Sequence, residues 1–445
     1  MHRRRFLRCC AALSSLGSAS HLAFAATPAT KATPPGRPPP PFDEWIRRRH
    51  ERVISAEKID GFLSPPPHNQ WAKFDAELGY VPNDSIQRDG VDGSHTVYRY
   101  GTAGERRMIN HADRPCRVNT YGNSFTQCHQ VSDGETWQEA LAAHLGEPIR
   151  NFGVGGYGVQ QAFVRLRRME QTAVKTPFLV FNIYDNDHER SIMPWRGFIT
   201  GSLHTVEMYH GNPWSHLRVN LDTGKWQETP NPCPTPESLR SLVSLEGARA
   251  LVGGHENIHL RAMIDGVADV PRDRVARLAD WAKFRFDFTD ADSRQRSAAE
   301  LNRIVARAST LVVMEKLHAL ATQENRRLLV LLSYGTRAIQ RACEGGVKLS
   351  DDVDLLRWYA ERGIPAFDIF DAHVADFAQF KISAADYIKR LFIVHYSPAG
   401  NHFFATAIRK TVVDWLDPQP PAYRAGGTII DFQDGRYLDK APRDR

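Results

Sequence analysis

The sequence predicts an α/β fold: a three-layer, doubly wound parallel sheet with an N-terminal extension and a large insertion. Strand-like and helix-like segments alternate over residues 113–190 and again over 300–417, and such alternation is typical of parallel sheets. The near-continuous apolar run "PFLVFNIY" at 177–184 is what a strand buried on both faces requires. A chain of 445 residues accommodates one large domain with insertions or two domains.

The first 25 residues are expected to be a signal peptide and not part of the fold. "RRRFLR" at 3–8 precedes an apolar run, and "AFA" at 23–25 offers small residues where a signal peptidase cleaves. The arginine pattern resembles a twin-arginine export signal, with an ordinary Sec signal as the alternative. Residues 26–42, rich in Pro and Ala, are predicted to be a flexible tether. We therefore expect an exported protein, located in the periplasm or outside the cell.

Charge and composition exclude several classes of partner. The formal net charge of +6 includes four arginines of the expected leader, so the rest of the chain is close to neutral. Electrostatic attraction therefore supports neither a nucleic-acid partner nor an anionic membrane. No apolar stretch reaches the roughly 18 residues of a membrane span. Beyond the leader, a Cys116–Cys128 disulfide and free thiols are both open, and no cysteines have zinc-finger spacing. The sequence does not specify an oligomeric state.

The N-terminal half contains an extension and the first strand–helix units. Residues 43–112 are the extension, with a helix near 41–56 and extended pieces around "TVYRYG". The core begins with a strand in "RVNTYG" at 117–122, and Ser132 and Glu135 form a capping-box pattern for a helix over 132–146. A second strand in "EPIRNFGVGG" at 147–156 and a helix at 159–171 follow.

The second half begins with the insertion, residues 191–297, where the strand–helix rhythm stops and a hairpin is expected to turn at 222–224. The rhythm returns with a helix at 298–323, a strand at 327–334, a helix at 350–363 and a strand at 365–370. The last helix is predicted from Ser397, as its N-cap, to about Leu416, with Pro398 in its first position. Residues 418–445 are a C-terminal tail. The main α/β domain is accordingly placed at 113–417.

Four polar or glycine-rich blocks stand at the ends of these elements. In open α/β sheets, ligands bind at the carboxyl ends of the strands. A serine that follows a strand, a glycine and an asparagine has the position of a nucleophile held on the turn at the end of a strand. The four blocks are Gly122-Asn123-Ser124, "NFGVGG" at 151–156, "YDNDHE" at 184–189 and "HYSPAGN" at 395–401.

In order and spacing, these blocks resemble the SGNH (GDSL-like) hydrolase family. The resemblance covers roughly 113–190 and 300–417, with 191–297 as an insertion. It implies a flavodoxin-like sheet and a serine esterase that needs no cofactor and no metal. It assigns the nucleophile to Ser124, the base to His395, and the oxyanion hole to Ser124, Gly156 and Asn186.

The chemistry of these residue types fits the assignment. A serine hydroxyl becomes a useful nucleophile when an imidazole accepts its proton, and His395 would be that base. The backbone N–H groups of Ser124 and Gly156 and the Asn186 side-chain amide would stabilise the oxyanion of the tetrahedral intermediate. His402, seven residues beyond His395, is expected to be a packing or surface histidine.

Two positions depart from the family pattern. Asn123 stands where the family has aspartate, and its amide is expected to make the same local hydrogen bonds beside the serine. Phe392 occupies the position of the acid that normally orients the histidine. Asp386 is the candidate replacement; the alternatives are Asp368, Asp371 or a backbone carbonyl.

The alternative interpretations of the blocks are structural or belong to other chemistry. Ser124 could be only a helix N-cap, the glycine block could bind phosphate, and "DNDHE" could hold a metal ion. We expect instead a carboxylic ester hydrolase, acting on a small-molecule or polysaccharide ester such as an O-acetylated carbohydrate. Rival functions are an O-acyltransferase and a non-catalytic carbohydrate-binding protein. Aromatic faces suit sugar rings, although these residues could equally form a small core: Trp195, Tyr209, Trp214 and Trp226.

Overall fold

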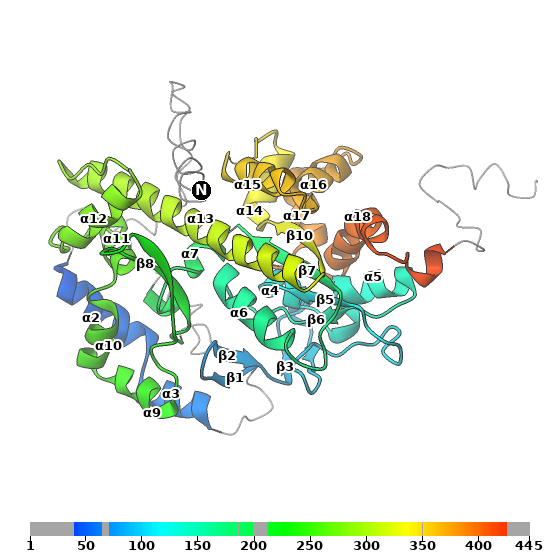
Figure 1. The fold of residues 1–445 in the computed structure, drawn as a ribbon, viewed down its shortest axis with the longest axis horizontal. Helices are drawn as coiled ribbons and strands as arrows, with labels where there is room; N and C mark the ends of the chain where they lie inside the picture. Colours follow the sequence, from blue (N-terminus) through cyan, green and yellow to red (C-terminus); the bar gives the residue numbers. More distant parts are fainter. Residues whose placement is uncertain (1–39, 65–70, 186, 199–211, 349, 425–445) are drawn as a thin grey trace, which may run out of the picture.

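The computed structural model describes residues 40–64, 71–185, 187–198, 212–348 and 350–424 (Figure 1). The expected signal peptide, almost all of the tether and most of the C-terminal tail lie outside these ranges, as do Asn186 and Tyr209. Within the described ranges, the buried apolar side chains form one continuous hydrophobic core. The extension, the insertion and the hydrolase-like region therefore share a single core.

A five-stranded parallel sheet lies at the centre of the fold. Numbered along the chain, its strands have the spatial order 2-1-3-4-5, so the winding reverses between β5 and β7. Every residue from Phe178 to Ile183 is buried, which shows that both faces of β7 are covered. The predicted α/β fold with a parallel sheet is thus confirmed. In spatial order the strands are β6 (Arg150–Asn151), β5 (Val118–Tyr121), β7 (Phe178–Tyr184), β10 (Arg327–Ser333) and β11 (Ala366–Asp368).

Helices flank this sheet, with α5 packed on α18 and α6 packed on α13. The long helix α13 runs from the helices of the insertion across to β10, and so ties the two regions together (Figure 1). The helices around the sheet are α4 (Ser124–Gln127), α5 (Trp137–Leu145), α6 (Val159–Met169), α7 (Asp187–Arg190), α13 (Ala291–Gln323), α14 (Thr336–Cys343), α15 (Ser350–Glu361), α16 (Ile369–Phe377), α17 (Ala384–Leu391) and α18 (Pro398–Trp415).

The extension contributes two helices and two small antiparallel hairpins. These are α2 (Phe42–Val53), α3 (Ala56–Leu63), β1 (Ala72–Asp75) with β2 (Gly79–Pro82), and β3 (Ser85–Gln87) with β4 (Thr96–Tyr98). The insertion contributes the predicted hairpin and four helices. These are β8 (His216–Asn220) with β9 (Lys225–Thr229), α9 (Pro236–Arg240), α10 (Leu245–Val252), α11 (Glu256–Ile264) and α12 (Asp273–Trp281).

The extension and the insertion pack directly against each other, although about 200 residues separate them in sequence. The α2 backbone N–H of Phe42 donates to Asp269 Oδ1 (2.8 Å), and the Trp45 indole donates to Asp265 Oδ2 (3.0 Å). Because α2 also packs on α10, neither region forms a separate layer.

Several element boundaries differ from the sequence prediction. The capping box of Ser132 and Glu135 is present, but it closes the short 3₁₀ turn at 133–135, and Thr136 caps α5 instead. The helix after the insertion starts at Ala291, because the Asp290 side chain caps its N-terminus. The insertion boundary at 297 therefore falls inside α13. At the other end, α18 follows the prediction, with Ser397 as N-cap and Pro398 first.

Two further findings concern disulfide bonds and membrane-spanning helices. Cys116, Cys128, Cys233 and Cys343 are all free thiols. Among the described residues, no helix combines the length and the apolar character needed to cross a membrane.

Candidate active site

The first strand of the core presents Ser124 on a sharp strand-to-helix turn. At Gly122 φ is 152°, and a Cβ there would approach the Asn182 carbonyl oxygen to 2.6 Å, so a residue without a side chain is needed. The Asn123 side-chain oxygen accepts the Phe125 N–H (2.7 Å) and caps α4. Ser124 is the first residue of this helix, at the carboxyl end of β5.

His395 contacts this serine, although the two residues are 271 positions apart in sequence. Its Nε2 lies 2.8 Å from Ser124 Oγ, a normal hydrogen-bond distance. The histidine occupies a tight loop closed by a bridge between Phe392 and Tyr396 and by a bond from the Ile393 N–H to the His395 carbonyl (2.8 Å). The ring also lies against Phe125, with 5.1 Å between the ring centroids.

The group that orients His395 is Gln130, which the sequence did not indicate. Gln130 Oε1 accepts the backbone N–H groups of Val394 (3.0 Å) and His395 (2.8 Å), and it lies 3.3 Å from His395 Nδ1. Two backbone donors require an oxygen at this position, so Nδ1 carries the proton and Nε2 is free to accept one from Ser124. The contact thus selects the tautomer that a general base needs.

The predicted acid, Asp386, lies elsewhere, and this expectation is corrected. Asp386 is in the first turn of α17, where its carboxylate accepts the hydroxyl of the capping Ser383 (2.7 Å). Asp368 caps α16 through the Phe370 N–H, and the exposed Asp371 pairs with Lys348. The alternative of a backbone carbonyl is not realised either, because a side-chain amide takes that role.

The surroundings of His395 keep its ring neutral. Burial, together with the nearby positive charges of Arg190 and Arg196, lowers the pKa of His395 to about 4. A second histidine, His129, lies 5.1 Å from it between ring centroids, and its Nε2–H donates to Gln127 Oε1 (2.8 Å). Burial also lowers the pKa of His129 well below its usual range, so both rings are uncharged at neutral pH.

The glycine block lies alongside the nucleophile turn. Two backbone bonds hold it there, from Phe152 to Thr120 (2.9 Å) and from Val154 to Gly122 (3.1 Å). Gly156 has a φ of 84°, a conformation that favours glycine. In the described part of the chain, neither the Ser124 N–H nor the Gly156 N–H has a hydrogen-bond acceptor. Asn186, the third predicted donor, lies outside the described residues.

The third block supports the nucleophile turn from β7. The Asn123 amide donates to Asp187 Oδ2, which also accepts the Tyr184 N–H (2.9 Å). Arg190 donates to Asp187 Oδ1 (2.8 Å). Burial raises the pKa of Asp187 to about 6, opposed by Arg190. The expected local role of Asn123 is therefore realised, and an aspartate there would face the Asp187 carboxylate.

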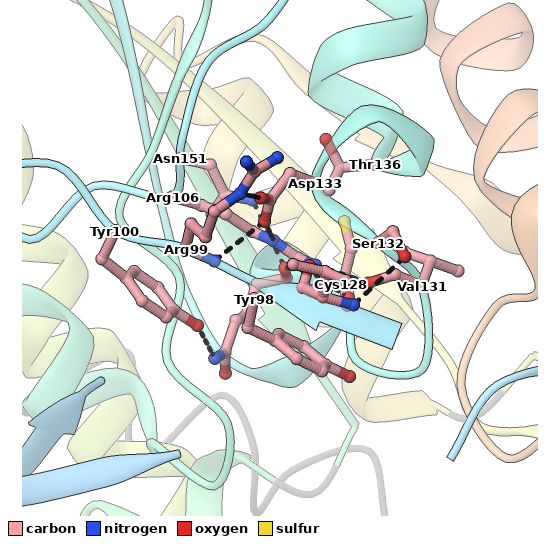
Figure 2. A network of polar contacts seen from close by, with 12 residues as sticks. Tyr98, Arg99, Tyr100, Arg106, Cys128, Val131, Ser132, Asp133, Thr136 and Asn151 are labelled. Atoms are coloured by element: carbon pink, nitrogen blue, oxygen red, sulfur yellow. Dashed lines mark hydrogen bonds and ion pairs between the residues drawn. The ribbon is translucent and has the colours of Figure 1, made fainter. Parts of the chain in front are cut away.

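The loop that carries Gln130 is held by a buried arginine of the extension, Arg106 (Figure 2). Arg106 Nη1 donates to the carbonyls of Gln127 (2.6 Å) and Cys128 (2.7 Å), and Nη2 donates to that of Val131 (2.5 Å). Its Nε pairs with Asp133 Oδ1 (3.1 Å). One fully buried guanidinium thus fixes the backbone on both sides of Gln130.

The other candidates do not join this site. His402 is exposed on α18, with its ring centroid 6.0 Å from that of His144. Trp195 and Trp214 are completely buried, so they form the small core and not a sugar-binding face. Trp226 packs edge-on against Trp281. Across the described residues, no group of three or more His, Cys, Asp or Glu side chains is placed to hold a metal ion.

Comparison with known proteins adds no identification. No protein-family model matches the chain, and no curated protein sequence matches it.

Proposed function

We propose that this protein is an exported serine hydrolase of the SGNH type that cleaves carboxylic esters through an acyl-serine intermediate. The observation that carries the proposal is the 2.8 Å contact between Ser124 Oγ and His395 Nε2. It lies at the carboxyl end of the sheet, beside the point where the winding reverses, which is where ligands bind in such sheets.

The residues support a two-step mechanism. As Ser124 Oγ attacks the ester carbonyl, its proton passes to His395 Nε2, and the carbonyl oxygen becomes an oxyanion. The N–H groups of Ser124 and Gly156 would stabilise that oxyanion, together with the Asn186 amide. When the tetrahedral intermediate collapses, His395 donates the proton to the departing alcohol. Water, activated by the same imidazole, then releases the acid and restores Ser124.

In the dyad of Ser124 and His395, Gln130 would orient the histidine ring but would not supply a negative charge. Its oxygen holds Nδ1–H, as the aspartate of a triad does, and keeps the ring aimed at Ser124. A neutral amide does not compensate the positive charge that His395 acquires during the reaction. His395 is therefore a weaker base than a triad histidine, but one that stays available down to low pH.

The substrate class proposed is an O-acylated carbohydrate, including O-acetyl esters. The buried tryptophans of the insertion provide no support for it, because their faces are not accessible. Export rests on the arginine-rich leader, which lies outside the described residues; peptide mapping of exported protein, with its first residue near Ala26, tests that part.

A fluorophosphonate probe tests the catalytic role directly. It should label Ser124 in the folded protein, because only an activated serine reacts at a useful rate. His395→Ala should abolish labelling and lower kcat for p-nitrophenyl acetate by about 10⁴-fold, by analogy with deletions in catalytic triads. His402→Ala is the matched control and should cost less than about tenfold. Labelling elsewhere, or equal losses for the two histidines, would contradict the assignment.

The same assay separates hydrolysis from acyl transfer. Adding a sugar acceptor to the p-nitrophenyl acetate reaction should leave free acetate as the main product of a hydrolase. An O-acyltransferase would instead place the acetyl group on the acceptor.

A further inference from the structure

The peptide group between Gly155 and Gly156 is held by a tyrosine of the extension. The hydroxyl of Tyr80, on β2, donates to the Gly155 carbonyl oxygen (2.6 Å). The Tyr80 side chain is completely buried, and burial raises the pKa of Tyr80 above its usual range, so the hydroxyl keeps its proton at neutral pH. This contact joins the extension to the glycine block of the candidate site.

The carbonyl that Tyr80 binds and the N–H of Gly156 belong to the same peptide group. This group is planar and trans, so its carbonyl and its N–H point in opposite directions and can only turn together. The Gly156 N–H is one of the proposed oxyanion donors, and it has no acceptor among the described residues. The hydrogen bond from Tyr80 therefore fixes the direction of this donor, and by polarising the peptide it also strengthens the donor.

This restraint matters because the peptide group lies between two glycines. Glycine has the widest choice of backbone angles, so a peptide group flanked by two of them turns easily when nothing holds it. Gly156 has a φ of 84°, in the region that other residues rarely adopt. The direction of its N–H is therefore set by contacts from neighbouring segments.

The N–H of Gly155 is held by the nucleophile loop. It donates to Oε1 of Gln127, the last residue of the helix that begins with Ser124 (2.5 Å). A Cβ on Gly155 would come within 2.4 Å of His129 Nε2, so only glycine allows the block to approach the loop this closely. Both polar backbone groups of Gly155 thus have a side-chain partner, one from the extension and one from the nucleophile loop.

Tyr80 is itself fixed from two directions. The Tyr157 hydroxyl donates to the Tyr80 carbonyl (2.5 Å), and the two rings meet edge to face with 5.4 Å between their centroids. On the insertion side, Gly79 has a φ of 76°, and a Cβ there would come within 2.5 Å of the Pro213 carbonyl oxygen. The insertion therefore packs directly against the strand that carries Tyr80.

We propose that Tyr80 is a positioning residue for the proposed hydrolase: through the Gly155 carbonyl, it aims the Gly156 N–H at the oxyanion of the tetrahedral intermediate. Tyr80 acts through the peptide group and not on the substrate. This inference rests on the proposed ester hydrolysis, and it gives the N-terminal extension a part in the chemistry of that site.

Tyr80→Phe tests the inference, because it removes the hydroxyl and keeps the ring. An oxyanion donor acts in the transition state and not on the bound ester, so kcat for p-nitrophenyl acetate should fall by roughly tenfold while KM stays nearly unchanged. The loss should be smaller than the roughly 10²–10³-fold for a donor that is removed outright, because the N–H is still present. Tyr387→Phe is the matched control: it also removes a buried hydroxyl, which donates to Asp376 (2.8 Å), and it should keep both constants.

A transition-state analogue distinguishes the aiming of a donor from a general loss of structure. Phenyl trifluoromethyl ketone should accept the Ser124 oxygen at its carbonyl carbon, so that the serine proton passes to His395 and the ketone oxygen becomes an oxyanion. Its Ki should rise in Tyr80→Phe by the same factor as kcat/KM falls. A fall in kcat/KM without this rise in Ki, a rise in KM alone, or constants equal to those of the unmodified protein would overturn the inference. Melting temperatures show whether the variants are folded.

An NMR measurement separates this inference from the proposed hydrolysis, because it needs no activity. Labelling glycine carbonyls with carbon-13 and glycine nitrogens with nitrogen-15 selects the amides of glycine pairs, which are 155–156, 253–254, 345–346 and 426–427, and Gly156→Ala identifies the first. Tyr80→Phe should shift the Gly156 amide signal, and Tyr387→Phe should not. If Tyr80→Phe does not fold, meta-fluorotyrosine at position 80, a stronger donor of similar shape, should shift the same signal.

The two proposals fail in different ways. If the Gly156 signal shifts while the unmodified protein neither cleaves p-nitrophenyl acetate nor binds the ketone, the hydrolase proposal fails and the contact of Tyr80 with this peptide group stands. If the signal does not shift, Tyr80 does not hold the peptide group, and the inference is wrong whatever the activity.

Discussion

At the scale of single residues, contacts with neighbouring residues explain why this site departs from the family pattern. Asn123 and Asp187 form one hydrogen-bonded pair, so an aspartate at 123 would place two carboxylates together. Gln130 takes the place of the missing acid because its oxygen satisfies two backbone donors and the His395 ring at once. The result is a histidine that is oriented by a hydrogen bond but not stabilised by a negative charge.

The pH dependence of the reaction follows from this arrangement. In the proposed mechanism, neutral His395 is the active form, and its pKa is lowered to about 4 by burial and two arginines. We therefore expect kcat/KM to rise with pH through about 4 and to be flat near neutrality. Gln130→Glu places a negative charge at Nδ1, which favours the imidazolium and raises the pKa of His395. The acidic limb of the profile should then move up by roughly one unit or more.

The control for this prediction is Gln379→Glu, the same change at an exposed position in the turn that follows α16. It should leave the acidic limb where it is in the unmodified protein. An unshifted limb in Gln130→Glu would show that the residue at 130 does not act on the catalytic ring.

At the scale of elements, sequence patterns predicted the scaffold better than the contacts between distant segments. The apolar run at 178–184 and the serine–proline start of α18 depend on local physics, and both have the predicted structure. Gln130 acts on a residue 265 positions away, and no local pattern marks such a pair. From the sequence, Asp386 is the candidate acid, with Asp368 and Asp371 as alternatives that could approach from other loops. The spacing Ser383-x-x-Asp386 could have indicated its role instead, because it is a helix-start pattern.

The extension also positions a loop of the candidate site, a role that its composition did not indicate. Arg106 binds three carbonyls of the loop at 127–131 and pairs with Asp133 (Figure 2). Its guanidinium lies over the Tyr98 ring, 4.5 Å from the centroid. The loop that presents Gln130 to His395 is therefore positioned by a residue of the extension, outside the hydrolase-like region.

Replacing Arg106 should damage both stability and catalysis. Arg106→Met leaves three carbonyls without their donor and leaves the buried Asp133 with Arg99 as its remaining arginine partner, which should cost about 3–5 kcal/mol. Melting temperature should fall by several degrees, and kcat for p-nitrophenyl acetate should fall in the protein that remains folded, because Gln130 loses its support. Arg99→Met is the control, since Arg99 pairs with the same Asp133 (2.8 Å) but is 43% exposed. A kcat in Arg106→Met equal to that of Arg99→Met would contradict the positioning role.

At the scale of the whole molecule, buried histidines couple the fold to pH. Among the described residues, burial lowers the pKa of seven histidines, five of them by a large amount, and these five lie in different regions that share one core. Two are at the candidate site, two form a pair in the insertion with 3.3 Å between their Nε2 atoms, and one is on α16, where it stacks on the Tyr396 ring. They are His129, His216, His255, His373 and His395.

The sign of this coupling is fixed by where the protons bind. An unfolded chain takes up protons at these histidines below about pH 6.5, whereas the folded protein keeps them neutral, with His216 protonating only near pH 4. The unfolded state therefore binds more protons, and stability falls as the pH drops below 6.5. Asp187, whose pKa is raised to about 6, opposes the trend in the same window, but it is one group against five.

We expect the protein to be clearly less stable at pH 5 than at pH 7. Each histidine that stays neutral in the folded state contributes roughly 2 kcal/mol to this difference, so five of them should lower the melting temperature by about 10 °C. His255→Asn should reduce the difference between the two pH values by about one such share, whatever it does to stability at pH 7. His402→Asn, at an exposed position on α18, should leave the difference unchanged. A melting temperature that is equal or higher at pH 5 would mean that these rings are charged or solvated in the folded protein, and the packing that surrounds them would have to be revised.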